Sequence, residues 1–209
     1  MKTEIPIADI SNQLIHQLSS FFPLSEEEKK ITKVKIERVV SRCEYCFSLT
    51  DNKYYSLNGE TYFNPYQSAQ YTIFLYYFSN TIFRETDNRI LADKLYYLNK
   101  IMNGCDLYYE VELPEYFTLD HPVGSVMGRA KYGEGFSFGQ NCTVGGNRDI
   151  YPVIGNDVYM CANSYIIGNC NIGDNVIIGA TSGVKDEDIP NDSIVFGHSP
   201  NLIIKHKKS

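Results

Sequence analysis

The chain has 209 residues, 43% of them hydrophobic and 21% charged, a composition that excludes a wholly disordered protein. Lys+Arg 19 against Asp+Glu 25 gives a formal net charge of −6, which argues against a nucleic-acid partner because phosphates require a basic surface. No apolar run is as long as the roughly 20 residues of a membrane span. The first residues lack the apolar core of a signal peptide. We therefore expect a cytoplasmic protein without a membrane span.

The six cysteines include one CxxC motif, formed by Cys43 and Cys46. A zinc site needs two further ligands at a similar spacing, and the other cysteines supply no second close pair. Cysteines in a cytoplasmic chain stay reduced. We therefore expect buried small side chains and no metal.

The first half of the chain has the periodicity of helices. Apolar residues recur every three or four positions on one predicted helix face, at Ile7, Ile10, Leu14 and Leu18. Ser25 followed by Glu28 has the pattern of a capping box, and an apolar stripe continues behind it through Ile31, Val34, Val39 and Cys43. The aromatic-rich residues 66–83 are long enough to favour a buried helix over a strand. A last helix over about residues 87–102 is closed by Asn103-Gly104 and has its inward positions at Ile90, Leu91, Leu95, Leu98 and Ile101.

The second half has an internal repeat of six residues. Its anchors stand six apart without slippage at Ile154, Met160, Ile166, Ile172, Ile178 and Val184, and an earlier run of the same period comprises Val126, Tyr132, Phe138 and Val144. Glycine often follows the anchor, and a small or modest side chain often stands four residues after it. The period fits neither a helix nor a hairpin meander, but it is typical of a triangular parallel β-helix. We therefore predict three short strands per coil with the anchors inside.

The two runs are out of phase, because Val144 and Ile154 are ten residues apart. Residues 146–153, GNRDIYPV, should therefore leave the prism as a loop, and such loops commonly carry binding residues. The change of periodicity predicts a helical domain over residues 1–105. A β-helix domain with a carboxy-terminal tail is predicted over residues 106–209.

At this point the sequence resembles the hexapeptide-repeat acyltransferases, and among them the serine acetyltransferases. That family has an aspartate fifteen residues before the histidine of an Asp-His-x-x-Gly motif, followed after about 22 residues by Thr-x-Gly-Gly. The matching residues here are Asp106, the segment Asp120-His121-Pro122-Val123-Gly124, and Thr143-Val144-Gly145-Gly146. The resemblance covers roughly residues 60–204. It implies an α+β fold, with a helical N-terminal domain followed by a left-handed parallel β-helix of hexapeptide repeats.

The sequence departs from that family in the loop after the double glycine. Serine acetyltransferases usually have Asp-Arg-His-Pro there, whereas this chain has Ile150-Tyr151-Pro152, with Arg148 displaced by two residues. A serine site must pair an ammonium and a carboxylate, and neither Ile150 nor Tyr151 carries a positive charge. We therefore expect acetylation of a sugar or surface-glycan hydroxyl, that is, polysaccharide modification. Two alternatives remain open: serine O-acetylation in cysteine biosynthesis, and a non-catalytic β-helix scaffold.

O-acetylation needs a base that takes the hydroxyl proton as the oxygen attacks a thioester. Histidine suits this work near neutral pH, and the resemblance makes His121 the catalytic base. The resemblance also makes Asp106 the carboxylate that orients His121, the alternative being an aspartate that simply meets solvent at a turn. The candidates for acceptor binding are Asp120, Arg148 and Tyr151.

Acetyl-CoA is the implied donor, with a longer acyl donor left open. By the resemblance, its pantetheine arm lies along the late coils between neighbouring subunits, where flat contacts need small side chains: Ala162, Gly179 and Ala180. A backbone N–H at the Gly145-Gly146 turn is a candidate oxyanion donor, the alternative being a tight corner. Lys185 is placed to meet a CoA phosphate, as an alternative to the terminal lysines. The resemblance further implies a homotrimer or a dimer of trimers.

Overall fold

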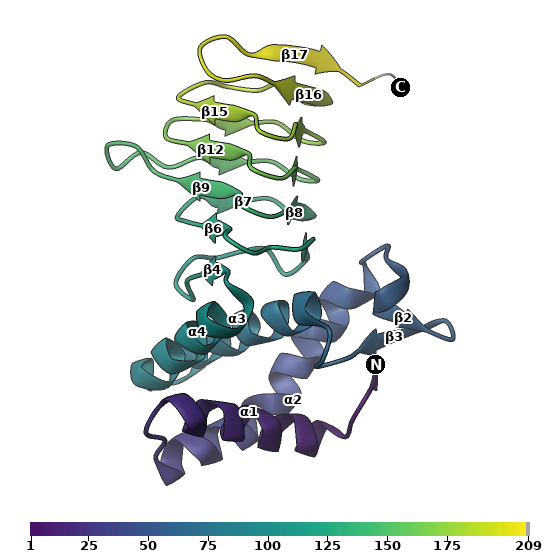
Figure 1. Ribbon diagram of the computed structural model, residues 1–209, viewed down its shortest axis with the longest axis vertical. Helices are drawn as coiled ribbons and strands as arrows, with labels where there is room; N and C mark the ends of the chain where they lie inside the picture. The colour runs from purple at the N-terminus through teal and green to yellow at the C-terminus, as the bar shows by residue number, and fades with distance from the viewer. Residues whose placement is uncertain (208–209) are drawn as a thin grey trace. The chain divides into compact units, whose positions relative to one another are not determined.

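The computed structural model describes residues 1–207 and divides into two compact units, Met1–Asn103 and Gly104–Ser209 (Figure 1). The first unit contains four α-helices, α1 (Ile7–Phe21), α2 (Glu26–Ser48), α3 (Ser68–Glu85) and α4 (Arg89–Asn103). A small sheet accompanies them, with strand order β1-β3-β2, made of β1 (Lys2–Thr3), β2 (Ser56–Leu57) and β3 (Glu60–Phe63). None of the helices within residues 1–207 is long and apolar enough to cross a membrane.

The helices form where the sequence predicts them. The predicted capping box opens α2: the Ser25 hydroxyl accepts from the Glu28 N–H at 3.2 Å, and the Glu28 carboxylate accepts from the Ser25 N–H at 2.8 Å. In α3, every residue from Gln70 to Ile82 is buried, which confirms a buried helix rather than a strand. Such a helix has no polar face, which explains why its periodicity is weak.

Three predicted core positions are wrong, because Val34, Ile90 and Ile101 are exposed. In α2 the buried stripe runs through Thr32, Ile36, Val39, Val40 and Cys43. Val34 is two residues from Thr32 and from Ile36, and at about 100° per residue it points away from that stripe. In α4 the inward positions are Leu91, Leu95 and Leu98, as predicted, and Ile90 and Ile101 flank them at the helix ends.

The CxxC motif lies on the inner face of α2. Cys43 and Cys46 are fully buried, and all six cysteines are free thiols. Burial raises the pKa of the Cys43 thiol well above its ordinary value, so the thiol behaves as a small apolar side chain. Within residues 1–207, no group of three His, Cys, Asp or Glu side chains is arranged to hold a metal ion.

The second unit is a solenoid of short strands stacked in three sheets, which we name by their strand number. The five-strand face has the order β15-β12-β9-β6-β4 and contains β4 (Asp106–Leu107), β6 (Val126–Met127), β9 (Thr143–Gly145), β12 (Tyr165–Ile167) and β15 (Gly183–Lys185). The six-strand face has the order β17-β16-β14-β11-β8-β5 and contains β5 (Phe117–Leu119), β8 (Phe136–Phe138), β11 (Tyr159–Met160), β14 (Ile177–Ile178), β16 (Ser193–Phe196) and β17 (Ile203–His206). The three-strand face has the order β13-β10-β7 and contains β7 (Lys131–Tyr132), β10 (Val153–Ile154) and β13 (Asn171–Ile172). Neighbouring coils pair in parallel, and only the terminal β17 within the described solenoid pairs antiparallel, with β16.

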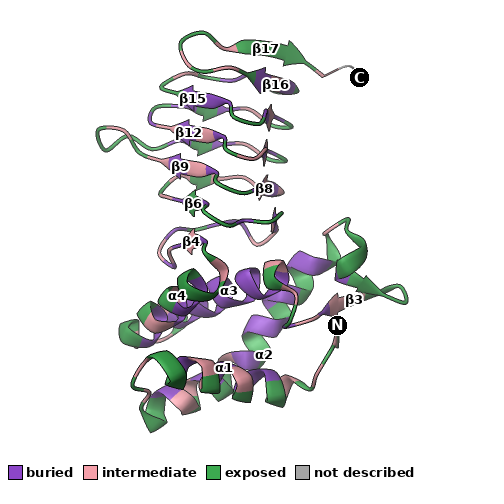
Figure 2. Ribbon diagram, in the orientation of Figure 1, coloured by how far each residue is buried: buried purple, intermediate pink, exposed green. Residues whose placement is uncertain are grey.

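The predicted anchors form the core of this solenoid (Figure 2). All six anchors of the second run are buried: Ile154, Met160, Ile166, Ile172, Ile178 and Val184. In the first run, however, Val126 is 40% exposed and its neighbour Met127 is buried. Successive residues of a strand face opposite sides, so a slip of one residue exchanges them. Met127 pairs with the anchor Val144 and stands five residues before Tyr132 rather than six, so the short corner between β6 and β7 shifts the phase.

Candidate active site

His121 lies at the first corner between the six-strand face and the five-strand face, after β5 and before β6. Its backbone is left-handed, with φ 49°, as it is at the equivalent corners of later coils: Asn141, Asn163 and Thr181. Asn and His are among the few non-glycine residues enriched in this conformation. The corner turns the histidine outward, and its side chain is 88% exposed.

Asp120 is the acidic partner that the structure gives His121. The distance between His121 Nε2 and Asp120 Oδ1 is 3.6 Å, and both side chains are exposed. The backbone N–H of Asp120 donates to the carbonyl of Phe138 at 2.9 Å, which ties the residue to the next coil.

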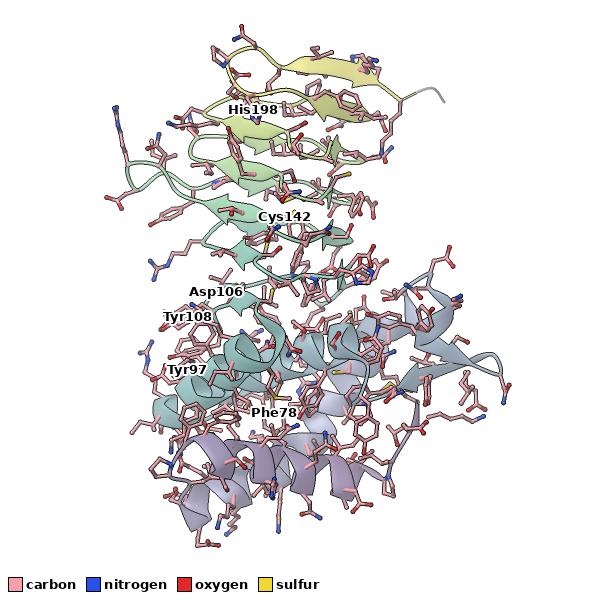
Figure 3. The ribbon with its side chains drawn as sticks, in the orientation of Figure 1. Phe78, Tyr97, Asp106, Tyr108, Cys142 and His198 are labelled. Atoms are coloured by element: carbon pink, nitrogen blue, oxygen red, sulfur yellow. The ribbon has the colours of Figure 1, made fainter. Side chains whose placement is uncertain are left out.

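Asp106 begins β4 (Figure 3), which pairs in parallel with β6, the strand that follows this corner. Its N–H donates to Ser125 at 2.8 Å, and the Gly124 N–H donates to Gly104 at 2.8 Å. These bonds place residues 104–106 beside the chain that directly follows His121. Because Leu107 points into the core, Asp106 points outward. The structure thus places Asp120 next to His121 at the corner, and Asp106 on the strand that pairs with β6, directly after that corner.

Small residues continue up the same corner from Asp120. The Gly139 N–H donates to the Met160 carbonyl, and the Cys161 N–H donates to the Ile178 carbonyl, each at 2.9 Å. These bonds stack Gly139, Cys161 and Gly179, which each directly follow an anchor, on one another. Three predicted cofactor-binding residues therefore lie on the corner that carries His121: Ala162, Gly179 and Ala180. Gly139 and Cys161 are not among the cofactor-binding residues predicted from the sequence. Their position directly after the core anchors Phe138 and Met160 could have indicated them.

The other predicted site residues lie at the opposite edge of the five-strand face within one chain. Gly145 and Lys185 end β9 and β15, and both pair in register with Ile167. Arg148 and Tyr151 lie in the loop that follows β9. The candidate residues therefore form two groups at opposite edges of the five-strand face. Within one chain, Gly145, Arg148, Tyr151 and Lys185 do not lie at the corner that carries His121.

The loop at residues 146–152 is a small hairpin that protrudes beside β9 and β12 (Figure 1). Asn147 and Ile150 exchange two backbone hydrogen bonds of 2.9 and 3.0 Å, and both central residues, Arg148 and Asp149, have positive φ. This is the geometry of a type I′ turn. The loop leaves the prism as predicted.

Asp186 ties the base of this hairpin to the solenoid. The Asn147 side-chain amide donates to the Asp186 carboxylate at 2.8 Å, and the Asn169 N–H donates to it at 2.9 Å. The bond from Asn169 is the largest cause of a lowered pKa of Asp186, followed by the bond from Asn147, and the charges of Lys185 and Arg148 contribute. Arg148 therefore lies near Asp186 at the exposed tip of a fixed turn.

Comparisons with known proteins agree with this architecture. The family model "Bacterial transferase hexapeptide (six repeats)" matches residues 151–186. The serine acetyltransferase of Synechococcus elongatus is 32% identical over 121 residues, which are 56% of this chain and 49% of that protein. The chain spans about half the length of the curated relatives it matches.

Two solved structures share the fold. The serine acetyltransferase of Neisseria gonorrhoeae superposes with a TM-score of 0.72 at 22% identity, covering 99% of this chain and 82% of that one. The serine acetyltransferase of Brucella abortus in complex with coenzyme A superposes with a TM-score of 0.72 at 17% identity, covering 99% of this chain and 84% of that one.

These relatives overturn the expected sugar or glycan acceptor. They are serine acetyltransferases, so they favour the serine alternative, and the prediction of polysaccharide modification is wrong. That prediction rested on counting residues from Pro152 back to Arg148. The turn geometry decides where the tip of a hairpin points, so a displacement of two residues in the sequence does not show where the guanidinium lies.

Both units match those neighbours in fold, and the repeat matches the hexapeptide model. Residues 151–186 therefore match the hexapeptide-repeat model, and the chain shares the fold of the solved serine acetyltransferases, a helical unit followed by a left-handed parallel β-helix.

Proposed function

We propose that the chain is an acetyl-CoA-dependent serine O-acetyltransferase with His121 as its general base. The observation that carries the proposal is the pair of His121 and Asp120, 3.6 Å apart on an exposed corner of the β-helix. The curated relatives, which are serine acetyltransferases, support L-serine as the acceptor.

The reaction moves an acetyl group from sulfur to oxygen. His121 takes the proton of the serine hydroxyl as that oxygen attacks the carbonyl carbon of the thioester. The carbon–sulfur bond then breaks, and the imidazolium gives its proton to the departing sulfur. Asp106 orients the imidazole and balances its charge, and Asp120 receives the serine ammonium.

The residues above Asp120 fit the donor. Gly139 has room beside it, because a Cβ there would meet the backbones of Ala162 and Met160 at 3.4–3.7 Å, which is ordinary contact distance. With Ala162 and Ala180 it forms a strip of small side chains on which a pantetheine arm can reach backbone groups. At Gly179 the Phe196 ring and the Val195 carbonyl occupy the space that a Cβ would take. At Gly145 a Cβ would meet nothing within 4 Å, so the backbone there is open to a ligand. Lys185 supplies a positive charge for a phosphate.

A trimer explains why the candidate residues occupy two edges of one face. In a threefold assembly, the hairpin edge of one protomer meets the His121 corner of its neighbour. Exposed apolar side chains support this at both edges, with Val123 beside His121 and Ile150 in the hairpin. Arg148, Tyr151 and Gly145 would then complete the site of the adjacent protomer in a homotrimer or a dimer of trimers.

Release of the CoA thiol tests the proposal. The purified chain with acetyl-CoA should release thiol when L-serine is added, and much less with D-serine or with a panel of hexoses. His121→Ala should lower that rate by about 10²–10⁴, as for the loss of a positioned base. Equal rates with and without L-serine would contradict the proposal.

A further inference from the structure

The helical unit contains a cavity that the acyl-transfer site does not use. It lies between α1 and α2 and has a volume of about 410 Å³, which is within the range of small-molecule sites. Each helix contributes one face to its walls: Ile7, Ala8, Ser11 and Asn12 from α1, and Lys33, Ile36 and Glu37 from α2. All of these residues belong to the first unit, so the cavity is separate from the corner that carries His121.

Ser11 gives this cavity a buried hydroxyl without a partner. The residue is 3% exposed, and its Oγ makes no hydrogen bond in the described part of the chain. A serine inside a helix ordinarily bonds the carbonyl four residues earlier, which here belongs to Ile7. Because buried hydroxyls in folded proteins are nearly always hydrogen-bonded, this group is available to a molecule in the cavity.

Two opposite charges flank that hydroxyl. Lys33 and Glu37 stand one turn apart on α2, and both line the cavity. Neither forms an ion pair among residues 1–207, whereas Lys29 and Glu26 on the same helix pair at 2.6 Å. Lys33 acts on Glu26 only as the smallest cause of its lowered pKa. The cavity is therefore lined by one positive and one negative group, both exposed, in addition to the buried hydroxyl of Ser11.

We propose that this cavity binds a small zwitterion of the chemical class of a free α-amino acid. Lys33 pairs with the carboxylate of the ligand, and Glu37 pairs with its ammonium. The Ser11 hydroxyl donates a hydrogen bond to the same carboxylate. Ile7 and Ile36 contact the apolar part of the ligand. Binding here requires neither acetyl-CoA nor His121, so it is independent of the proposed function.

Calorimetric titration of the full chain with a panel of L-amino acids, L-serine included, tests this site. Lys33→Met and Glu37→Gln should each weaken binding about tenfold or more, as for the loss of one charge-assisted hydrogen bond. Ser11→Ala should weaken binding without lowering the melting temperature of the free protein, because it removes a hydroxyl that has no partner. Lys30→Met is the matched control, since Lys30 is exposed on α2 outside the cavity.

The same titration on Asp120→Asn separates this cavity from the acceptor site. Binding that survives in Asp120→Asn and weakens in Lys33→Met supports the proposal. Binding that is lost in Asp120→Asn and unchanged in Lys33→Met overturns it. Failure of every amino acid to bind with a Kd below about 1 mM also overturns it, because the cavity then holds only water.

Discussion

Two aspartates, Asp120 and Asp106, are the candidate partners of the proposed base His121, and their different positions suggest different roles. Asp120 lies 3.6 Å from His121 on the exposed corner, where an acceptor arrives from solvent. Asp106 is fixed on β4 by its backbone bond to Ser125. We propose that the first contacts the acceptor and that the second orients the imidazole.

Replacing each aspartate by asparagine separates these roles. Asp120→Asn should raise KM for L-serine about tenfold or more, because the amide no longer pairs with the ammonium. Asp106→Asn should chiefly lower kcat, because the imidazole loses its orientation and charge compensation. Steady-state kinetics in L-serine provide the measurement, with Glu112→Gln, an exposed carboxylate of the same unit, as control. Identical changes in both variants would argue against the division of roles.

At the scale of elements, the start of α2 shows local chemistry fixing a helix in its unit. Glu28 is buried, and its carboxylate accepts hydrogen bonds from the Ser25 N–H at 2.8 Å and from Lys94 on α4 at 2.6 Å. Burial opposes the ionisation of Glu28, but the hydrogen bonds from Lys94 and Ser25 outweigh it and lower its pKa. One side chain thus caps α2 and ties it to α4.

The lowered pKa of Glu28 predicts an acid-sensitive contribution to stability. A carboxylate with a lower pKa in the folded state stabilises the fold above its unfolded pKa, about 4.3, and loses that effect as the pH falls through its folded pKa. The melting temperature should therefore fall more steeply below about pH 4.3 in the wild type than in Glu28→Gln. Glu27→Gln, an exposed neighbour on α2, serves as control. If the melting temperatures of wild type and Glu28→Gln change in parallel with pH, ionised Glu28 does not contribute acid-sensitive stability.

The sequence predicts such local features well and spatial relations poorly. Six-residue spacing repeats the same coil, so the second run of anchors is buried throughout, and the capping box needs only a serine and a glutamate three apart. The prediction for Val126 is wrong because the corner between β6 and β7 is one residue shorter than a strict six-residue spacing requires. No local pattern indicates that Arg148 and His121 lie at different edges of one face, because that separation follows from how the coils close. The cavity beside Ser11 likewise depends on how α1 packs on α2.

For the whole molecule, we propose that neighbouring protomers complete each site. The two groups of candidate residues stand at opposite edges of the five-strand face, and each edge has an exposed apolar side chain. Placing Val123 against the hairpin edge of a neighbour buries both of these side chains. Assembly and activity should therefore be lost together.

Val123→Asp tests this coupling. A charge buried in the interface without a partner should dissociate the trimer and abolish acetyl transfer, while the monomer keeps its fold. Light scattering coupled to size-exclusion chromatography measures the mass, and circular dichroism checks the fold. Ile203→Asp on the exposed β17 is the control and should leave both mass and activity unchanged. A fully active Val123→Asp monomer would show that one chain contains a complete site.

The central claim, that His121 transfers acetyl to the hydroxyl of L-serine, is tested most directly by identifying the product. The chain is incubated with acetyl-CoA labelled with carbon-13 in the acetyl group and with L-serine, and the reaction is followed by NMR. We predict that the label moves to an ester on the serine oxygen with equal release of free CoA, and that His121→Ala slows this transfer by about 10²–10⁴. Absence of the ester with the wild-type chain, or its formation at the same rate by folded His121→Ala, would contradict the account.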